Sequence, residues 1–440
     1  MKSVIKQGLY MSIYVNRVLN LKQIKAIGFD MDHTLVEYHA DEFEGLVHKK
    51  TIEKLISNLG YPKKINDLVF DPKLVIQGLV IDKRRGNVLK LSRFGKVKKA
   101  FHGTTEMSFE ELQKQYRTMV IDLNDPNYQS LDTAFSISHG VLFMQLSESC
   151  PEIGFEQLAT DIKNMIDVCH RDGTLKNEVK ANVEKYIKQN KKIVETLEDF
   201  KKAGKKLLLI TNSEYSYSKT LMEYAFNPFL KDHKSWLDLF DVSLTLSRKP
   251  KFFTERQAFL RIDPNTGLME NFEEEKYQGL FQGGNANDLQ QYLGLEGEEI
   301  LYLGDHIFGD VVSIKKSCNW RTALVCYPIE AEVQGVKKSS PHQEEINRLM
   351  KDKVVLEKDY RKNSESIDQI NQKISELIIT IQSNFNPNWG ELMRSGAEES
   401  RFADQLEKYS CIYMESVADL LTYGPKFYFR PFKRYLPHEI

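Results

Sequence analysis

Two aspartates, Asp30 and Asp32, stand one residue apart directly after the apolar run 26–29. Such a run is typical of a strand buried on both faces of a parallel sheet, and ligands of open α/β sheets bind where the strands end. Because side chains alternate along an extended segment, both carboxylates can face one point, where they repel each other unless a cation or a shared proton lies between them. The pair therefore indicates Mg²⁺ binding or acid–base catalysis. The alternative is a strand end whose aspartates cap backbone N–H groups.

A second apolar run, residues 207–210, is followed by Thr211, Asn212 and Ser213. These small hydroxyl and amide groups could cradle an anion together with the first N–H groups of the next helix, or they could only cap that helix. Further along, Pro250 fixes Lys249 in a loop, where a lone lysine is usually solvated.

A third apolar run, residues 300–303, has the same pattern as the first one. It is followed by Gly304 and by two acids, Asp305 and Asp310. We expect a buried strand, a glycine that allows close approach, and carboxylates at the same kind of sheet edge.

The three predicted strands account for only a small part of the chain. At 440 residues the sequence is too long for one ordinary core, so we expect two domains or a core with a large insertion. Between the first two strands, residues 75–82 and 88–93 predict a β-hairpin across a turn that contains Gly86. We interpret this interval as an inserted cap.

A helix is predicted within the same interval, from Phe155 to Cys169, because apolar residues recur there at helical spacing. The opposite stripe of that helix carries Lys163, Asp167 and His170. These side chains either face one ligand together or form a solvated charged face.

The C-terminal part has a second helical pattern, with an apolar stripe over residues 367–381 bracketed by Pro341 and Pro387. Such a stripe is more typical of core or subunit contact than of a binding site. The segment from Trp389 onward is aromatic and basic, which fits packing across the core. Residues 1–20 are also expected to pack against the core.

Composition narrows the class of protein. The net charge is -1, from 61 basic and 62 acidic residues, so the sequence lacks the excess of basic residues that is typical of nucleic-acid-binding proteins. Five cysteines without C-x-x-C spacing argue against a disulfide framework or a zinc site. No apolar run approaches the roughly 20 residues that a bilayer needs. We expect a soluble cytoplasmic protein whose partners are small molecules or protein surfaces.

The ordered set D-x-D-x-T at 30–34, Thr211, Lys249 and G-D-x-x-x-x-D at 304–310 is similar to the signature of haloacid dehalogenase-type phosphohydrolases. The stretches around these residues, together with the terminal stretch 427–439, resemble the cytosolic purine 5′-nucleotidases, which prefer IMP and GMP. The sequence departs from that family at His33 and Glu214, where the family usually has Tyr and Asp.

The resemblance implies an α/β fold with a Rossmann-like parallel sheet core of the haloacid dehalogenase type and a large inserted α+β cap. We expect residues 1–60 and 186–440 to form the core with a C-terminal helical extension, and residues 61–185 to form the cap.

The resemblance also implies a Mg²⁺-dependent 5′-nucleotidase. Asp30 would attack phosphorus to give an aspartyl phosphate, and Asp32 would protonate the leaving ribose oxygen and later activate water. The metal ligands would be Asp30, the Asp32 backbone carbonyl and Asp305. Lys249 would offset negative charge and hold Asp30. The remaining expected roles are phosphate binding by Thr211, Asn212 and Ser213, and support of the metal-bound water or Lys249 by Asp310.

Purine recognition is assigned to the cap by the same resemblance. Asp167 would accept the purine N1–H, Phe135 would stack on the base, and His170 and Lys176 lie in the matching nucleoside-binding segment. Lys163 stands where the family typically has Arg, so bidentate reading of the 6-oxo edge is lost and the base preference is expected to be looser.

The resembling enzymes form oligomers and bind an activating purine nucleotide beside the helix that follows the second acid pair. Phe308 and Lys316 match that site, whereas Asp132 stands where the family has a neutral Asn, so weaker ATP activation is expected.

Three alternatives stay open: a nucleoside phosphotransferase with the same intermediate, a phosphatase for sugars or other small molecules, and a non-enzymatic nucleotide-binding scaffold. A scaffold would be expected to have lost one of the four core residues Asp30, Asp32, Lys249 and Asp305, and all four are present.

Overall fold

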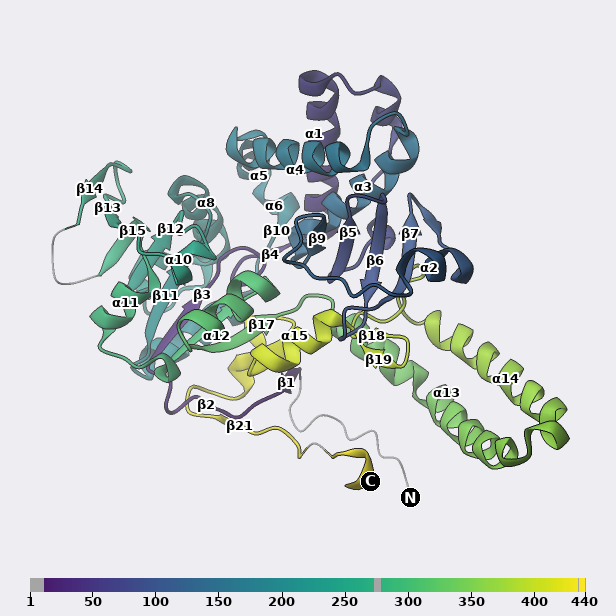
Figure 1. The fold of residues 1–440 in the computed structure, drawn as a ribbon. Helices are drawn as coiled ribbons and strands as arrows, with labels where there is room; N and C mark the ends of the chain where they lie inside the picture. The colour runs from purple at the N-terminus through teal and green to yellow at the C-terminus, as the bar shows by residue number, and fades with distance from the viewer. Residues whose placement is uncertain (1–11, 273–277, 434, 440) are drawn as a thin grey trace.

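The computed structural model describes residues 12–272, 278–433 and 435–439. A ten-stranded sheet forms its largest layer (Figure 1). In sheet order its strands are β1 (Ile13–Val15), β20 (Ile412–Met414), β17 (Arg321–Val325), β16 (Ile300–Gly304), β3 (Ala26–Phe29), β11 (Lys206–Ile210), β12 (Val242–Thr245), β15 (Gly279–Gly283), β13 (Phe259–Ile262) and β14 (Met269–Asn271). The strands from β20 to β15 pair in parallel, and β1, β13 and β14 pair antiparallel at the two edges. The predicted α/β fold with a parallel sheet is confirmed.

The three strands predicted to carry the chemistry are neighbours in the middle of this sheet, in the order β16-β3-β11. All four residues of β3 are buried, because helices cover both faces of the sheet. One face packs against α7 (Lys191–Lys202) and α8 (Tyr215–Ala225), and the other packs against α10 (Lys251–Thr254), α11 (Ala286–Leu293) and α12 (Ser313–Ser317). The near-continuous apolar runs of the sequence follow from this burial.

Gly28 in β3 is required by its neighbour in the sheet. A Cβ atom at this position would lie 2.8 Å from the ring of Tyr302 on β16, which is closer than side chains tolerate. The glycine therefore lets the Tyr302 ring lie across β3, and the Tyr302 hydroxyl reaches the end of β11, where it donates to the Ile210 carbonyl at 3.0 Å.

A second body of structure is inserted between β4 (Glu37–Tyr38) and β10 (Ile187–Lys188), which pair antiparallel so that the ends of the insertion meet. It contains a five-stranded antiparallel sheet in the order β8-β7-β6-β5-β9. In chain order these strands are β5 (Leu79–Asp82), β6 (Asn87–Leu91), β7 (Val97–His102), β8 (Thr105–Glu106) and β9 (Tyr128–Leu131). The predicted hairpin is β5–β6, with its first strand starting at Leu79 instead of residue 75.

Helices pack on this second sheet and on one another. They are α1 (Ala40–Leu59), α3 (Ile137–Ser149), α4 (Phe155–Arg171) and α5 (Thr174–Ala181). Helix α3 contacts β6, β7 and β9, while α1 contacts α3, α4 and α5 (Figure 1). The predicted helix from residue 155 is therefore confirmed as α4, and its apolar stripe is buried. The division of residues 1–60 and 186–440 from residues 61–185 stays a prediction.

Two long helices, α13 (Ile329–Leu356) and α14 (Tyr360–Gln382), pack against each other and project from the body as a hairpin (Figure 1). The predicted helix over residues 367–381 is α14. Of the two prolines that bracket this pattern, Pro341 lies inside the preceding helix, α13. The apolar stripe of α14 is only partly covered: Ile367 is buried, whereas Ile378 is 41% exposed.

The segments at both ends of the chain pack on the main sheet, as expected. Strand β1 pairs with β20, and β2 (Leu19–Asn20) pairs with β21 (Tyr428–Phe429). Residues 1–11, part of the segment expected to pack on the core, lie outside the described residues. All five cysteines are free thiols. Among the described residues, no helix is both long and apolar enough to cross a bilayer.

Candidate active site

Lys249 connects residues at the ends of strands β3, β12 and β16. Its ammonium lies 2.9 Å from Asp30 Oδ1 and 2.9 Å from Asp310 Oδ1, and it donates a hydrogen bond to the Tyr302 hydroxyl at 2.9 Å. Asp30 follows β3, Lys249 lies in the loop after β12, and Asp310 follows β16. The parallel sheet therefore brings residues that are far apart in sequence to one point at its carboxyl edge, and the loop lysine is ion-paired, not solvated.

Burial and mutual repulsion govern the charges of this group. Burial raises the pKa of Asp30 to about 7, although the neighbouring Lys249 ammonium acts in the opposite direction. Burial together with the charges of Asp30 and Asp310 raises the pKa of Asp305 well above its ordinary value. Burial alone would lower the pKa of Lys249, but the carboxylates of Asp30 and Asp310 outweigh it and raise that pKa. The lysine is therefore a fixed positive charge.

Asp30, Asp305 and Asp310 offer carboxylate oxygens that all lie within 4.8 Å of one another. Three buried carboxylates around one lysine leave negative charge in excess, and oxygen ligands of this kind suit a hard divalent cation. The group thus fits a metal site. The carboxylate of Asp32 is not part of this cluster, while that of Asp310 is.

The Asp32 carboxylate is held separately, by two hydroxyl groups. Tyr38 donates to its Oδ1 at 2.6 Å, and Ser213 donates to its Oδ2 at 2.7 Å. The Tyr38 hydroxyl also lies 3.1 Å from that of Tyr217. Burial raises the pKa of Asp32, although these hydrogen bonds favour its ionised form. A carboxyl group with a raised pKa and a fixed orientation suits proton transfer.

The segment after β11 braces the site. Asn212 accepts from the Lys249 backbone N–H at 2.6 Å and donates to the Lys249 carbonyl at 3.1 Å, so it fixes the loop that carries the lysine. Thr211 accepts from the Ser213 N–H at 3.0 Å. The helix that follows, α8, has Glu214 at its N-cap position and no side-chain cap. Capping of that helix therefore does not explain the Thr211 and Ser213 side chains.

The inserted body contributes two residues to the same place. Thr133 donates to Asp305 Oδ2 at 2.8 Å, and the Phe135 ring lies edge-on to the buried His33 ring, with 4.3 Å between ring centres. Both residues line an active-site cavity of about 200 Å³ together with Asp30, Asp32, Thr211, Asn212, Lys249 and Asp305. This volume lies below the roughly 300–1,000 Å³ of common ligand pockets, so it suits a phosphoryl group better than a whole nucleotide.

Of the residues expected to contact the base, Phe135 lines this cavity, whereas Lys163, Asp167, His170 and Lys176 do not. On α4, Lys163 and Asp167 are exposed and His170 is half-buried, with its pKa lowered to about 4 by burial. Lys176 on α5 forms an ion pair with Glu214 at 3.2 Å. The alternative of a solvated face describes Lys163 and Asp167 in this structure.

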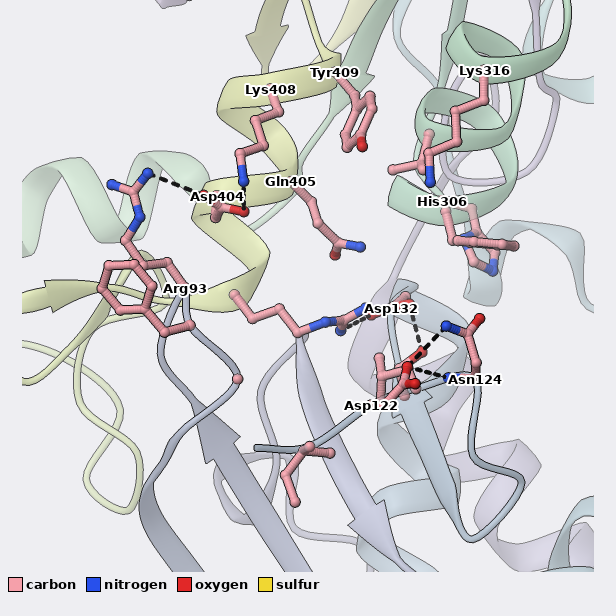
Figure 2. A pocket seen from close by; sticks show the side chains of 18 of the residues that line it. Arg93, Asp122, Asn124, Asp132, His306, Lys316, Asp404, Gln405, Lys408 and Tyr409 are labelled. Carbon is pink, nitrogen blue, oxygen red and sulfur yellow. Dashed lines mark hydrogen bonds and ion pairs between the residues drawn. The ribbon is translucent and has the colours of Figure 1, made fainter. Parts of the chain in front are cut away.

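A larger cavity of about 660 Å³, here called the junction cavity, lies between the inserted body and the main body (Figure 2). The three residues expected to form an effector site, Asp132, Phe308 and Lys316, all line it. Asp132 is buried; its carboxylate accepts from the Ser130 hydroxyl at 2.5 Å and lies 3.7 Å from the Arg401 guanidinium.

Sequence reasoning missed Tyr38, Tyr217, Tyr302 and Thr133. The Tyr38 hydroxyl contacts Asp32, the Tyr302 hydroxyl contacts Lys249, and the Tyr217 hydroxyl lies beside that of Tyr38. All three occupy aromatic positions that are typical of ordinary core. Thr133 lies 172 positions before Asp305 in the chain, without any pattern that links the two. The sequence did give a weak indication for Tyr302. It lies among apolar residues of a predicted buried strand, where the phenol hydroxyl needs a hydrogen-bond partner.

Comparison with known proteins finds relatives among the 5′ nucleotidases. The model of the 5′ nucleotidase family matches residues 13–440. A 5′-nucleotidase domain-containing protein from Dictyostelium discoideum is 26% identical over 445 aligned residues, which cover 97% of this chain and 74% of that protein.

Two solved structures are also similar. A predicted phosphoglycolate phosphatase from Haemophilus somnus is 15% identical, with a TM-score of 0.31 over 69% of this chain and 85% of that one. CbbY from Rhodobacter sphaeroides, in complex with phosphate, is 12% identical, with a TM-score of 0.26 over 69% of this chain and 86% of that one. At these values neither likeness carries an argument about this chain.

Proposed function

The chain belongs to the 5′ nucleotidase family and is a phosphoric monoester hydrolase for nucleoside monophosphates, and we propose that it prefers purine nucleoside 5′-monophosphates. In this proposal IMP and GMP are the best substrates, and the reaction passes through an aspartyl-phosphate intermediate. The observation that carries the mechanism is the contact of Asp30 Oδ1 with Lys249 at 2.9 Å beside the carboxylates of Asp305 and Asp310. It gives a buried nucleophile with a fixed cation next to it.

The reaction has two displacements. An Asp30 carboxylate oxygen forms a bond to phosphorus while the bond from phosphorus to the ribose 5′-oxygen breaks, and Asp32 gives its proton to the leaving oxygen. Asp32, now ionised, takes a proton from water as the water oxygen bonds to phosphorus. The bond between phosphorus and Asp30 then breaks and releases phosphate. Tyr38 and Ser213 hold Asp32 in place for both proton transfers.

Asp30, Asp305 and the Asp32 backbone carbonyl would hold Mg²⁺, with Asp310 beside them. When bound, the cation supplies positive charge that lets a dianionic phosphate approach three carboxylates. Lys249 orients Asp30, and it is kept in position by Asn212 and by the Tyr302 hydroxyl. Thr211 and the N–H groups near it bind the non-reacting phosphate oxygens.

The cap would select the base. Phe135, which lines the active-site cavity, is proposed to contact the nucleoside. Asp167, Lys163, His170 and Lys176 are proposed to contact the purine, on the strength of the matched segment alone. The junction cavity is proposed to take a nucleotide effector, because Phe308 offers an exposed ring and Lys316 a cation in a space of sufficient volume. We also propose that the protein forms a homo-oligomer.

The test is a phosphate-release screen of IMP, GMP, AMP and several sugar phosphates. The enzyme is assayed with Mg²⁺, after chelation, and after Mg²⁺ is restored, with Asp30→Asn as the inactive control. We expect the 6-oxopurine nucleotides to be the best substrates, with activity lost on chelation and recovered afterwards. A sugar phosphate with a higher kcat/KM than IMP would contradict the substrate proposal. Inosine added with GMP as the phosphoryl donor separates hydrolysis from transfer, because a phosphotransferase then converts inosine to IMP and releases guanosine.

A further inference from the structure

A third cavity, of about 440 Å³ and here called the acidic cavity, lies between the inserted body and the base of α13. Its walls are largely apolar, with aromatic rings from Phe70, Tyr327 and Phe385. The Phe385 ring packs directly against the backbone of α13, because a Cβ atom on Gly335 would lie only 2.5 Å from that ring. The volume is within the range of small-molecule sites, and the rings offer faces for stacking.

The charges of this cavity have one sign. Asp41, Glu44 and Glu332 line it, and none of its described lining residues is a lysine, arginine or histidine. The Glu332 carboxylate accepts the backbone N–H groups of Leu392 and Met393, both at 2.9 Å, so it is engaged. Asp41 is exposed at the first turn of α1.

Glu44 differs from both of these acids. Its side chain is 3% exposed; Oε2 accepts the Ser138 N–H at 2.7 Å, and Oε1 is buried without a hydrogen-bond partner. A buried carboxylate oxygen without a donor is costly, and native structures usually satisfy such an atom. A ligand that supplies a positively charged donor would remove that cost.

We propose that the acidic cavity binds a small molecule that combines an apolar ring system with a protonated amine and carries no phosphate. The rings fill the apolar space, and the ammonium pairs with Glu44 Oε1. A phosphorylated ligand is disfavoured because three carboxylates would face it without a compensating cation. The site is thus distinct in chemistry from both the active-site cavity and the junction cavity.

The acidic cavity shares a short piece of chain with the active site. Ala134 and Ile137 line the acidic cavity, whereas Thr133 and Phe135, on the same turn, line the active-site cavity. Gln77, another lining residue, donates to the Asp132 carbonyl at 2.8 Å. A ligand in the acidic cavity would therefore contact the turn that positions Thr133 against Asp305.

The test uses two probes with the same ring, tryptamine as the amine and indole-3-propionate as the anion, titrated into the full chain by calorimetry without substrate. We expect tryptamine to bind at one site and indole-3-propionate to bind roughly tenfold more weakly or not at all. Equal affinity for the two probes, or no tryptamine binding, would overturn the proposal. Because no turnover is measured, this result is independent of the proposed nucleotidase reaction.

Three variants locate the site. Glu44→Gln keeps an acceptor for the Ser138 N–H and removes the charge, and Ala331→Trp adds volume at an exposed lining position of α13. Each should weaken tryptamine binding roughly tenfold or more. Glu42→Gln removes an exposed charge from the same turn of α1 outside the cavity and should leave binding unchanged. Unchanged binding in the first two variants, or an equal loss in all three, would refute the location.

Discussion

At the scale of single residues, the site depends on how two neighbouring aspartates are held for different tasks. Asp30 contacts the Lys249 ammonium, whereas the Asp32 carboxylate accepts hydrogen bonds from the Tyr38 and Ser213 hydroxyl groups. A cation favours an ionised nucleophile, and neutral donors leave a buried carboxyl group able to carry a proton. Position and surroundings thus separate the two roles within three residues of sequence.

Tyr38→Phe tests the positioning of Asp32. The change removes the hydroxyl that donates to Asp32 Oδ1 at 2.6 Å. We expect kcat to fall about tenfold, the equivalent of one hydrogen bond to a charged group, with little change in KM because Tyr38 does not line the active-site cavity. Tyr217→Phe is the matched control, since it removes a hydroxyl one step further from Asp32, and its loss should be smaller. Equal kcat for Tyr38→Phe and wild type would contradict the assignment.

Glu44 should make stability depend on pH. Burial raises its pKa from 4.5 to about 7 in the folded protein, so the folded state binds this proton more tightly than the unfolded chain does. The free energy of unfolding therefore decreases as pH rises from about 4.5 to about 7, by about 3 kcal/mol from this group. Glu44→Gln should flatten the curve in that window relative to the exposed control Glu42→Gln. Parallel denaturation curves for the two variants would contradict this.

At the scale of elements, the sheet order explains why the catalytic core could be predicted from sequence. Strands β16, β3 and β11 are apolar without alternation because helices cover both faces, and polar residues begin where each strand ends. Parallel strands place those ends at one edge. The convergence of Asp30, Asp305 and the segment after β11 therefore followed from local patterns alone.

The same reasoning could not find contacts that depend on packing between distant elements. Thr133 reaches Asp305 only because the inserted body lies against the carboxyl edge of the main sheet, and no periodicity records that placement. The extent of α13 also could not be predicted from sequence. A proline usually ends or kinks a helix, but helix α13 continues through Pro341 to Leu356. Local propensity was overridden there by the pairing of α13 with α14.

Helix α4 carries the prediction on base selection. Its Asp167 is exposed, so water can satisfy the carboxylate when a substrate lacks the N1–H donor. We therefore expect a modest preference of IMP over AMP in kcat/KM, about tenfold or less, and not the larger factor of a buried carboxylate. Asp167→Asn should bring the two values together. Comparable values for AMP and IMP in the wild type would refute a role for Asp167.

At the scale of the whole molecule, two bodies meet around the active site and leave the junction cavity between them. Asp132 and Arg93 come from the inserted body, while Lys316 and Tyr409 come from the main body (Figure 2). A ligand there would touch both bodies. It could shift an equilibrium only as far as it binds one arrangement better than the other.

Asp132 should weaken activation by ATP at this cavity, for two reasons. It adds a negative charge, and it lies 3.7 Å from Arg401, a guanidinium that could otherwise bind phosphate. Asp132→Asn should therefore lower the ATP concentration that half-activates IMP hydrolysis. Strong activation of the wild type with no gain in the variant would contradict this expectation.

The central claim is that Asp30 carries the phosphoryl group, and trapping it is the most direct test. The enzyme is mixed with IMP labelled in its phosphate, quenched in acid during turnover, and digested to locate the label. We predict a labelled peptide with the phosphoryl group on Asp30 in the wild type, and neither label nor turnover in a folded Asp30→Asn variant. Turnover by Asp30→Asn at near wild-type rate, or label on another residue, would contradict the account.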